Sequence, residues 1–381
     1  MDVVIVTMIP SPYQVELFNA IAASGHLSLS AVYLQEKDPG RQWSRRERGH
    51  EASIASDDLD ASVQRVRKAD LAVISCYRER TARTLIKARD QAGTPWAFWG
   101  ERPGFTVDGW MGCLFRRVAL HRLHASPAPI WGIGSWAVQR YREEFGPNRS
   151  YFNVPYFSNL RRFQKAADAS RAVVPPSTEH DTGHDAEHPG QNNSRTIRLL
   201  YSGSLSERKG VDLLAQAFAD VAPDHPHLTL DVAGDGPLRN MMETTLSSLR
   251  DRVTFHGFVS WDILPNLYAR ADVLCAPSRY DGWGLIVPEG LAAGLPVVGT
   301  ERMGAAIDLI TPEETGWRIP ANDRTALRDT LHRVAELSNE SLSSMSRGAQ
   351  EKILNDHMIE NGVEVFAEAA EASLRDFNAS V

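Results

Sequence analysis

The sequence predicts an α/β protein made of two doubly wound, Rossmann-like parallel-sheet domains that face each other across a cleft. Its 381 residues are enough for two domains of ordinary size. Along most of the chain, short apolar runs alternate with amphipathic stretches, which is typical of βαβ units. The polar segment 164–195 contains no Leu, Ile, Phe, Trp, Tyr or Met, and it divides the chain into two such blocks.

The first block, residues 1–163, is predicted to be one domain, with strands at 3–7, 29–34, 71–75 and 96–99 and helices at 14–23, 81–91 and 135–145. The second block, 196–355, has expected strands at 197–202, 228–233, 253–256, 273–276 and 297–299. Its expected helices are 212–219, 238–249, 263–269, 288–293 and 325–337. Residues 356–381 hold a final helical pattern, which either caps the second domain or crosses back to the first.

The segment 164–195 is expected to be a flexible linker, because it has too little apolar surface to offset the entropy lost on ordering. His180, His184 and His188 recur every four residues within it and on a helix could bind a metal. Gly183 and the nearby prolines disfavour such a helix, so we expect a solvated loop.

Composition excludes several classes of protein. The formal net charge of −7 argues against nucleic acid as the main partner. The first 163 residues nevertheless carry 22 Lys and Arg against 16 Asp and Glu, a net of +6, which suggests an anionic partner for that half or simply uneven composition. Cys76, Cys113 and Cys275 form no metal-binding or disulfide pattern, so a reducing cytoplasm is the expected location. No apolar run of 18 residues occurs, so membrane contact would be peripheral.

The most informative segment is 278–298, where a glycine-rich turn follows an expected strand and leads into a helix. Backbone N–H groups at such a helix start favour anions, and glycines let a phosphate approach closely. Asp281 and Glu289 lie eight residues apart around this turn, and a carboxylate can accept two hydrogen bonds from a vicinal diol. The segment is therefore a candidate seat for a sugar and a nucleotide ribose.

Two further segments add to it. Arg208 and Lys209 stand in the loop between a strand and a helix, where cations would meet a diphosphate. Gly234 and Gly236 lie in a strand-to-helix turn that resembles half of a dinucleotide-binding fingerprint but lacks its third glycine.

In this order, and followed by a His-Gly-Phe-Val strand end and Ala-x-Gly-x-Pro-Val, these segments resemble retaining family 4 glycosyltransferases of the GT-B fold, also called glycosyl transferases group 1. The resemblance is close over residues 197–340 and covers the first half only in outline, through the loop at residues 10–13. It implies that the first domain binds the acceptor and the second binds a nucleotide sugar.

The resemblance also implies roles for individual residues. Lys209, with Arg208, would pair with the donor diphosphate, Glu289 would hold the ribose, and Asp281 would lie beside the transferred sugar. The family usually has Glu at the position of Asp281 and often Arg at that of Ser204, which puts the sugar preference in question. The predicted catalytic residues are Asp281, Glu289, Lys209, Glu101 and Arg102. The predicted donor-binding residues are Gly203, Ser204, Arg208, Lys209, Gly234, Phe258, Val259, Gly282, Trp283, Gly284, Leu285 and Glu289, and Pro12 and Tyr13 are predicted on the acceptor side.

The implied reaction moves a hexose from a UDP- or GDP-sugar to an acceptor hydroxyl with retention, without a metal or other cofactor, in the synthesis of polysaccharide, glycolipid or another glycoconjugate. The alternatives are an inactive GT-B protein that only binds a nucleotide sugar and, less favoured, a dinucleotide-dependent oxidoreductase. Asp235 and His256 are expected to be structural, and Trp283 either packs the loop or stacks on a sugar.

The stretch 110–122 predicts a helix whose Trp110, Met111, Leu114, Phe115 and Val118 share an arc of roughly 140°. Arg116 and Arg117 fall outside this arc. The helix either contacts an anionic membrane near a lipid-linked acceptor, at the inner face of the membrane, or packs its apolar arc into the core with a basic side in solvent.

The composition of the expected linker leads to a first prediction, which concerns stability. Deleting residues 172–192 should leave the unfolding temperature nearly unchanged, because the deleted segment lacks core residues. Thermal unfolding of the purified deletion variant checks this, and loss of soluble folded protein would contradict it.

Overall fold

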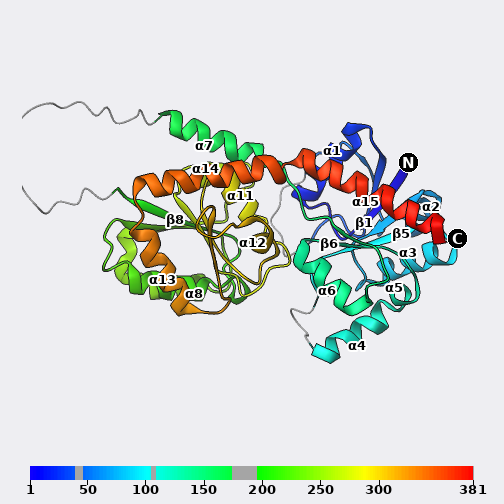
Figure 1. The fold of residues 1–381 in the computed structure, drawn as a ribbon, viewed down its shortest axis with the longest axis horizontal. Coiled ribbons are helices and arrows are strands. Elements are labelled where there is room, and N and C mark those ends of the chain that lie inside the picture. The colour runs from blue at the N-terminus through cyan, green and yellow to red at the C-terminus, as the bar shows by residue number, and fades with distance from the viewer. Residues whose placement is uncertain (39–45, 104–108, 174–194, 381) are drawn as a thin grey trace, which may run out of the picture. The chain divides into compact units, whose positions relative to one another are not determined.

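The structure, a computed structural model, describes residues 1–38, 46–103, 109–173 and 195–380. The chain divides into two units. The first comprises Met1–Asn159, Gly282–Gly284 and Asn355–Val381, and the second comprises Leu160–Asp281 and Leu285–Leu354. Each unit has its own parallel sheet with helices packed on it (Figure 1), which confirms the predicted fold class.

The first unit contains a seven-stranded parallel sheet of order β3-β2-β1-β4-β5-β6-β7. The strands are β1 (Asp2–Thr7), β2 (Ser28–Tyr33), β3 (Glu51–Ile54), β4 (Leu71–Ile74), β5 (Trp96–Gly100), β6 (Ile130–Gly132) and β7 (Tyr151–Asn153). The helices are α1 (Pro12–Ser24), α2 (Leu59–Lys68), α3 (Arg80–Gln91), α4 (Gly109–Ala119), α5 (His121–Ala125), α6 (Ser135–Phe145) and α15 (Ile359–Ser380).

The second unit contains a six-stranded parallel sheet of order β10-β9-β8-β11-β12-β13. Its strands are β8 (Ile197–Ser202), β9 (Leu228–Ala233), β10 (Val253–Gly257), β11 (Val273–Ala276), β12 (Val297–Thr300) and β13 (Gly316–Ile319). Its helices are α7 (Arg161–Val173), η1 (Glu207–Lys209), α8 (Val211–Val221), α9 (Arg239–Thr245), η2 (Ser247–Arg252), α10 (Leu264–Tyr268), α11 (Ile286–Ala292), α12 (Gly304–Leu309), α13 (Arg324–Ala335) and α14 (Asn339–Asp356). The strand order reverses between β8 and β11, which is where doubly wound sheets bind ligands.

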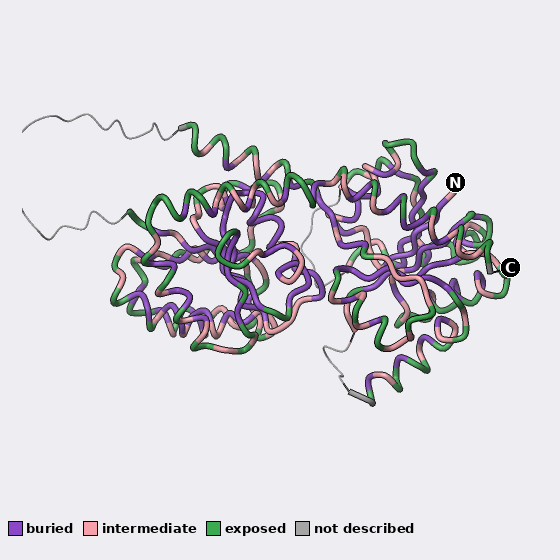
Figure 2. Tube along the Cα trace, in the orientation of Figure 1, coloured by how far each residue is buried: buried purple, intermediate pink, exposed green. Residues whose placement is uncertain are grey.

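Burial explains why the central strands could be predicted. In β1 the side chains of Val3, Val4, Ile5 and Val6 are all fully buried, because helices cover both faces of a parallel sheet. Such strands appear in the sequence as continuous apolar runs, and every expected strand is present within a residue or two at each end. Figure 2 shows the same pattern in both units, with buried strands and exposed outer faces of the helices.

Several elements were not predicted. β6 and β7 have three residues each, too few to show a pattern, and β3 is only partly buried. α14 has 18 residues, but its serines and Gly348 hide the spacing of its buried Leu342, Met345, Ala349 and Ile353.

The first part of the segment expected to be a linker is helical. Residues 164–173 continue helix α7, whereas 174–194, including His180, His184 and His188, lie outside the described residues. α7 is anchored at its start by the buried ring of Phe163, which packs 4.9 Å from the ring of Tyr268. Near its end, the Arg171 guanidinium donates to the Ala293 carbonyl and the Ser346 hydroxyl, each at 3.1 Å. Tertiary contacts therefore hold a helix that its composition alone does not favour.

The final helix, α15, belongs to the first unit. Its Phe366 is fully buried with its ring 5.1 Å from that of Trp131, and Ser373 accepts a 3.0 Å hydrogen bond from the Trp131 indole nitrogen. Of the two expected positions, the structure thus has the helix packed on the first unit.

Among the described residues of the first unit, Arg89 is the most deeply buried cation, with no exposed surface. Its guanidinium donates to the carbonyls of Pro95 at 2.8 Å, Val66 at 2.9 Å, Arg67 at 3.1 Å and Asp70 at 2.7 Å. Burial lowers the pKa of Arg89 to about 10, with nearby Asp70 opposing the effect. One side chain therefore joins the end of α2, the start of β4 and the turn before β5.

Replacing this side chain should destabilise the first unit. Arg89→Met keeps the length but leaves buried carbonyls without a donor, which should cost at least about 3 kcal/mol. Urea unfolding measures the loss, and Arg67→Met, at an exposed arginine on α2, is the matched control. Equal midpoints for the two variants would contradict the assigned role.

Candidate functional site

The loops that follow β8 and β9 touch at the carboxyl edge of the second sheet. The Gly203 amide donates to the Ala233 carbonyl at 2.9 Å, and the Gly234 amide donates to the Gly257 carbonyl at 2.7 Å. Gly203 and Gly234 have φ of 144° and 149°, and a Cβ on Gly234 would lie 1.8 Å from the Gly203 oxygen. Only glycine fits at position 234, and two predicted donor-binding residues therefore lie side by side where these loops touch.

Lys209 and Arg208 lie on the short helix η1, which Gly210 ends with φ of 69°. A Cβ on Gly210 would be 2.0 Å from the Pro277 carbonyl oxygen, so this turn is pressed against the loop that follows β11. The contact brings both cations to Asp281: the Lys209 Nζ forms a direct ion pair with Oδ2, and the Arg208 guanidinium lies 3.5 Å from Oδ1. The structure thus joins two neighbouring predicted cations to a predicted carboxylate that lies 72 positions from Lys209 in the sequence.

The electrostatics of this group favour charge on Asp281. Burial alone would raise the pKa of Asp281, but the charges of Lys209 and Arg208 outweigh it and hold the pKa below its usual range. Lys209 and Asp281 are mostly buried, whereas Arg208 remains 39% exposed. Two cations facing one carboxylate leave a net positive charge, so the loop can accept an anion.

Arg279 and Asp212 brace this loop and were missed by sequence reasoning. The guanidinium of Arg279 forms two hydrogen bonds of 2.7 Å to the Asp212 carboxylate at the start of α8. The Arg279 amide also donates to the Arg208 carbonyl at 2.9 Å. Neither residue stands in a recognised motif position, so no local signal could have identified the pair.

Glu289 lies in α11 and is only 2% exposed. The Tyr268 hydroxyl donates to its Oε2 at 3.3 Å, and the guanidinium of Arg162 lies 4.0 Å from Oε1. Burial, and next the Glu289 charge, raise the pKa of Tyr268 well above its ordinary value, so this hydroxyl stays a donor. Arg162 is fixed in turn by stacking 3.7 Å above the ring of Trp261. Tyr268 and Arg162 therefore orient the carboxylate, and the sequence had identified neither.

The remaining predicted donor-side residues differ in accessibility. Trp283 is 1% exposed and its ring lies 5.4 Å from that of His357, which favours packing over stacking on a sugar. Gly284 has φ of 93° and Leu285 caps the start of α11. Phe258 is 49% exposed, whereas Val259 and Gly282 are half-buried or buried.

Three other expectations concern turns and strand ends. The Asp235 side chain accepts from the Gly236 amide at 2.7 Å, which shapes its turn as predicted. His256 pairs across strands with Asp231 at 2.9 Å, so it too is structural. The Ser204 carbonyl accepts from the Tyr201 hydroxyl at 2.7 Å.

Within the described ranges, no three His, Cys, Asp or Glu side chains are grouped as metal ligands.

The first unit brings together Tyr13, Tyr156 and Glu101. The rings of Tyr13 and Tyr156 lie 4.9 Å apart, and burial followed by the charges of Tyr13 and Glu101 raises the pKa of Tyr156 well above its ordinary value. Glu101, directly after β5, is exposed, and its carbonyl accepts from the Tyr141 hydroxyl at 2.7 Å. Tyr156 was missed because it stands in no motif, yet it joins the residues predicted on the acceptor side.

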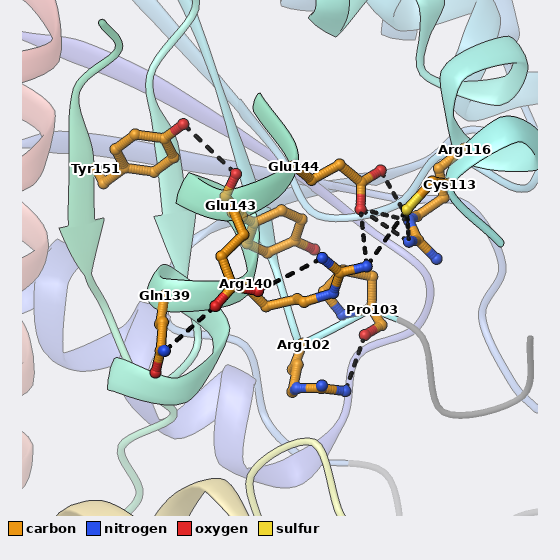
Figure 3. Close-up of polar contacts among 10 residues, drawn as sticks. Arg102, Pro103, Cys113, Arg116, Gln139, Arg140, Glu143, Glu144 and Tyr151 are labelled. Atoms are coloured by element: carbon orange, nitrogen blue, oxygen red, sulfur yellow. Dashed lines mark hydrogen bonds and ion pairs between the residues drawn. The ribbon is translucent and has the colours of Figure 1, made fainter. Parts of the chain in front are cut away.

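Arg102 and Pro12 are placed differently from Tyr13. The Arg102 guanidinium stacks 4.3 Å from the ring of Trp136. It also donates to the Pro103 carbonyl at 3.2 Å (Figure 3). Pro12 is buried at the first position of α1, where its fixed φ and missing N–H suit a helix start. Pro12 therefore has a structural role in positioning Tyr13.

Comparison with known proteins finds similarity mainly in the second unit. Residues 185–352 match the family described as glycosyl transferases group 1. An uncharacterized glycosyltransferase of Methanocaldococcus jannaschii is 36% identical over 32% of this chain and 32% of its own length. A GDP-mannose-dependent monoacylated alpha-(1-6)-phosphatidylinositol monomannoside mannosyltransferase of Corynebacterium glutamicum is 23% identical over 63% of this chain and 61% of its own. The chain thus spans between a third and three-fifths of the length of these curated relatives.

Solved structures share the whole fold. Anabaena HepE, determined in complex with UDP, superposes with a TM-score of 0.73 at 14% identity, covering 98% of this chain and 100% of HepE. Sucrose-phosphate synthase from Thermosynechococcus elongatus gives a TM-score of 0.70 at 17% identity over 100% of both chains. Residues 185–352 are thus similar to glycosyl transferases group 1, and the chain shares the GT-B fold of these solved structures.

Proposed function

We propose that this protein is a retaining family 4 glycosyltransferase that transfers a hexose from a UDP- or GDP-sugar to an acceptor hydroxyl. The observation that carries the proposal is the cluster of Lys209, Arg208 and Asp281, held on glycine-lined loops at the carboxyl edge of the second sheet. A nucleoside diphosphate matches this cluster in charge and needs the close backbone approach that the glycines allow.

The chemistry then follows from charge. The bond between the anomeric carbon and the diphosphate oxygen breaks, the acceptor oxygen bonds to the same face of that carbon, and the departing phosphate oxygen takes the acceptor proton. Lys209 and Arg208 stabilise the leaving diphosphate, and no metal or other cofactor is invoked for this step. The donor phosphate replaces Asp281 as the partner of these cations, which leaves the Asp281 carboxylate available to the sugar.

Glu289 is suited to the ribose. A buried carboxylate can accept hydrogen bonds from two neighbouring hydroxyls, and Tyr268 and Arg162 hold it in one orientation. The donor sugar nucleotide and the free nucleotide both contain the ribose, so both would make this contact with Glu289.

On the acceptor side, we propose that Tyr13, Tyr156, Glu101 and Arg102 of the first unit meet a glycan or lipid-linked hydroxyl. Relatives named as phosphatidylinositol mannoside and lipopolysaccharide core mannosyltransferases support an acceptor of this class, in polysaccharide, glycolipid or glycoconjugate synthesis. The three unpaired cysteines support a reducing cytoplasm as the location.

A nucleotide-sugar-binding protein without transferase activity is the main competing function, and a dinucleotide-dependent oxidoreductase is a weaker one. A ligand that binds the folded state raises the unfolding temperature. UDP or GDP should therefore stabilise the protein and NAD should not, and release of nucleotide in a screen of sugar donors then distinguishes a transferase from a binding protein.

Removing the Lys209 charge should weaken nucleotide binding. A lost charge-assisted contact costs about 1.5 to 3 kcal/mol, so Lys209→Ala should raise the Kd for the nucleoside diphosphate by roughly 10- to 100-fold. Calorimetric titration measures the change, with Arg347→Ala at an exposed position of α14 as control. An unchanged Kd in a folded variant would exclude Lys209 from the diphosphate site.

Substitutions of Glu289 and Asp281 should differ in their effects on nucleotide binding and on turnover. Glu289→Gln should weaken binding of both donor and free nucleotide, because both contain the ribose. Asp281→Asn should leave free nucleotide binding unchanged or tighter, since it releases Lys209 and Arg208, and should lower turnover. Calorimetry with the nucleotide and a steady-state transfer assay give both values. Identical behaviour of the two variants would contradict the separate roles.

A further inference from the structure

Helix α4 exposes an apolar face. Met111, Leu114, Phe115 and Val118 are 60%, 55%, 58% and 69% exposed, and at helical spacing they fall within about 100° of the helix circumference. A contiguous patch of large apolar side chains on an exposed face is typical of a surface that binds a protein or a membrane. None of the helices in the described part of the chain is both long and apolar enough to span a bilayer.

A buried ion pair fixes this orientation. The guanidinium of Arg116 donates to both carboxylate oxygens of Glu144 on α6, with an Nε–Oε1 distance of 2.9 Å and an Nη2–Oε2 distance of 2.8 Å. Both side chains are at most 5% exposed, and Arg140 lies nearby at 3.8 Å from Glu144 (Figure 3). The expectation that Arg116 lies on a basic solvent side is therefore wrong, and so is the alternative in which the apolar arc faces the core.

A cationic groove of about 230 Å³ lies beside the end of α4, between α3 and α5. Arg80, Arg83 and Lys87 line it from one face of α3, and they form no ion pair with any carboxylate in the described ranges. Arg122 lines it from α5, held by a 2.6 Å ion pair to Asp90. The apolar residues Leu120 and Trp96 also line the groove.

We propose that α4 and this groove form one docking surface for an anionic phospholipid bilayer. The four apolar side chains enter the boundary between headgroups and acyl chains, and the groove takes a lipid phosphate against Arg80, Arg83 and Lys87. Exposed apolar residues lie here beside cations that have no carboxylate partner among the described residues. This combination fits a bilayer, whose interior is apolar and whose anionic headgroups are negative.

The positive charge of the groove favours an anionic bilayer over a second copy of this chain as the partner of the surface. In a symmetric dimer formed through α4, the same surface meets itself, so the cations of one groove would approach those of the other. That repulsion opposes such a dimer and favours an anionic partner. The inference does not depend on transferase activity, because it uses residues of the first unit outside the proposed donor and acceptor sites.

Vesicle flotation tests the surface. The protein should float with vesicles of phosphatidylcholine and phosphatidylglycerol at low salt, less at high salt, and not with phosphatidylcholine alone. Leu114→Ser should lower the partition coefficient about tenfold or more, through lost apolar insertion, and Arg83→Ser about fivefold, through one lost charge near the surface. Arg116 is unsuitable for substitution because its removal would leave Glu144 buried and unpaired.

Matched controls separate docking from general surface effects. Ile263→Ser removes an equally exposed apolar side chain from the second unit, and Arg347→Ser removes an exposed cation there; neither should alter flotation. UDP titration of each variant reports the donor site independently, so failure of the transferase proposal would not be mistaken for failure of docking. Absence of flotation at low salt, equal losses in the controls, or a dimer that Leu114→Ser dissociates in sedimentation would overturn the proposal.

Discussion

Close backbone contact at the carboxyl edge of the second sheet is the constraint on which the candidate donor site depends. A Cβ on Gly234 would collide with Gly203, and one on Gly210 would collide with Pro277, so these loops can meet only where side chains are absent. The contact at Gly210 presses the turn that carries Lys209 against the loop that leads to Asp281. Two residues separated by 72 positions thereby form an ion pair. The glycines contribute to function through what they allow other residues to reach.

The Asp281 carboxylate offsets part of the positive charge that Lys209 and Arg208 bring to this edge of the sheet. An isolated cation or carboxylate at low exposure would cost several kcal/mol in desolvation, of order 3 to 5 when a partner is removed. Asp281 compensates Lys209 and Arg208, and Arg162 lies near the buried Glu289. In the proposed donor complex a diphosphate would take the place of Asp281 beside these cations, and cations that are already in position favour electrostatic stabilisation of a leaving group.

A buried ion pair decides which side of α4 faces solvent. Its apolar residues would ordinarily be placed in the core, but the opposite side of the helix carries Arg116, whose pairing with Glu144 requires that side to face inward. The ion pair thus decides which surface the helix presents, and the apolar face beside the groove of α3 and α5 becomes a consequence of the packing. The two proposed surfaces, for nucleotide and for lipid, depend on charge pairing that lies outside any short motif.

The sequence by itself determined the parallel α/β architecture, the central strands and the segments that carry Lys209, Asp281 and Glu289, because continuous apolar runs and glycine-rich turns express local requirements of the backbone. It left α14, the short strands β6 and β7 and the helical start of the linker unpredicted, because their patterns are weak. Only the tertiary structure decided that Arg279 braces Asp212, that Tyr268 and Arg162 orient Glu289, that Tyr156 joins Tyr13, and which side of α4 is buried. Each of these depends on partners distant in sequence, whose meeting is a property of the folded chain rather than of any local segment.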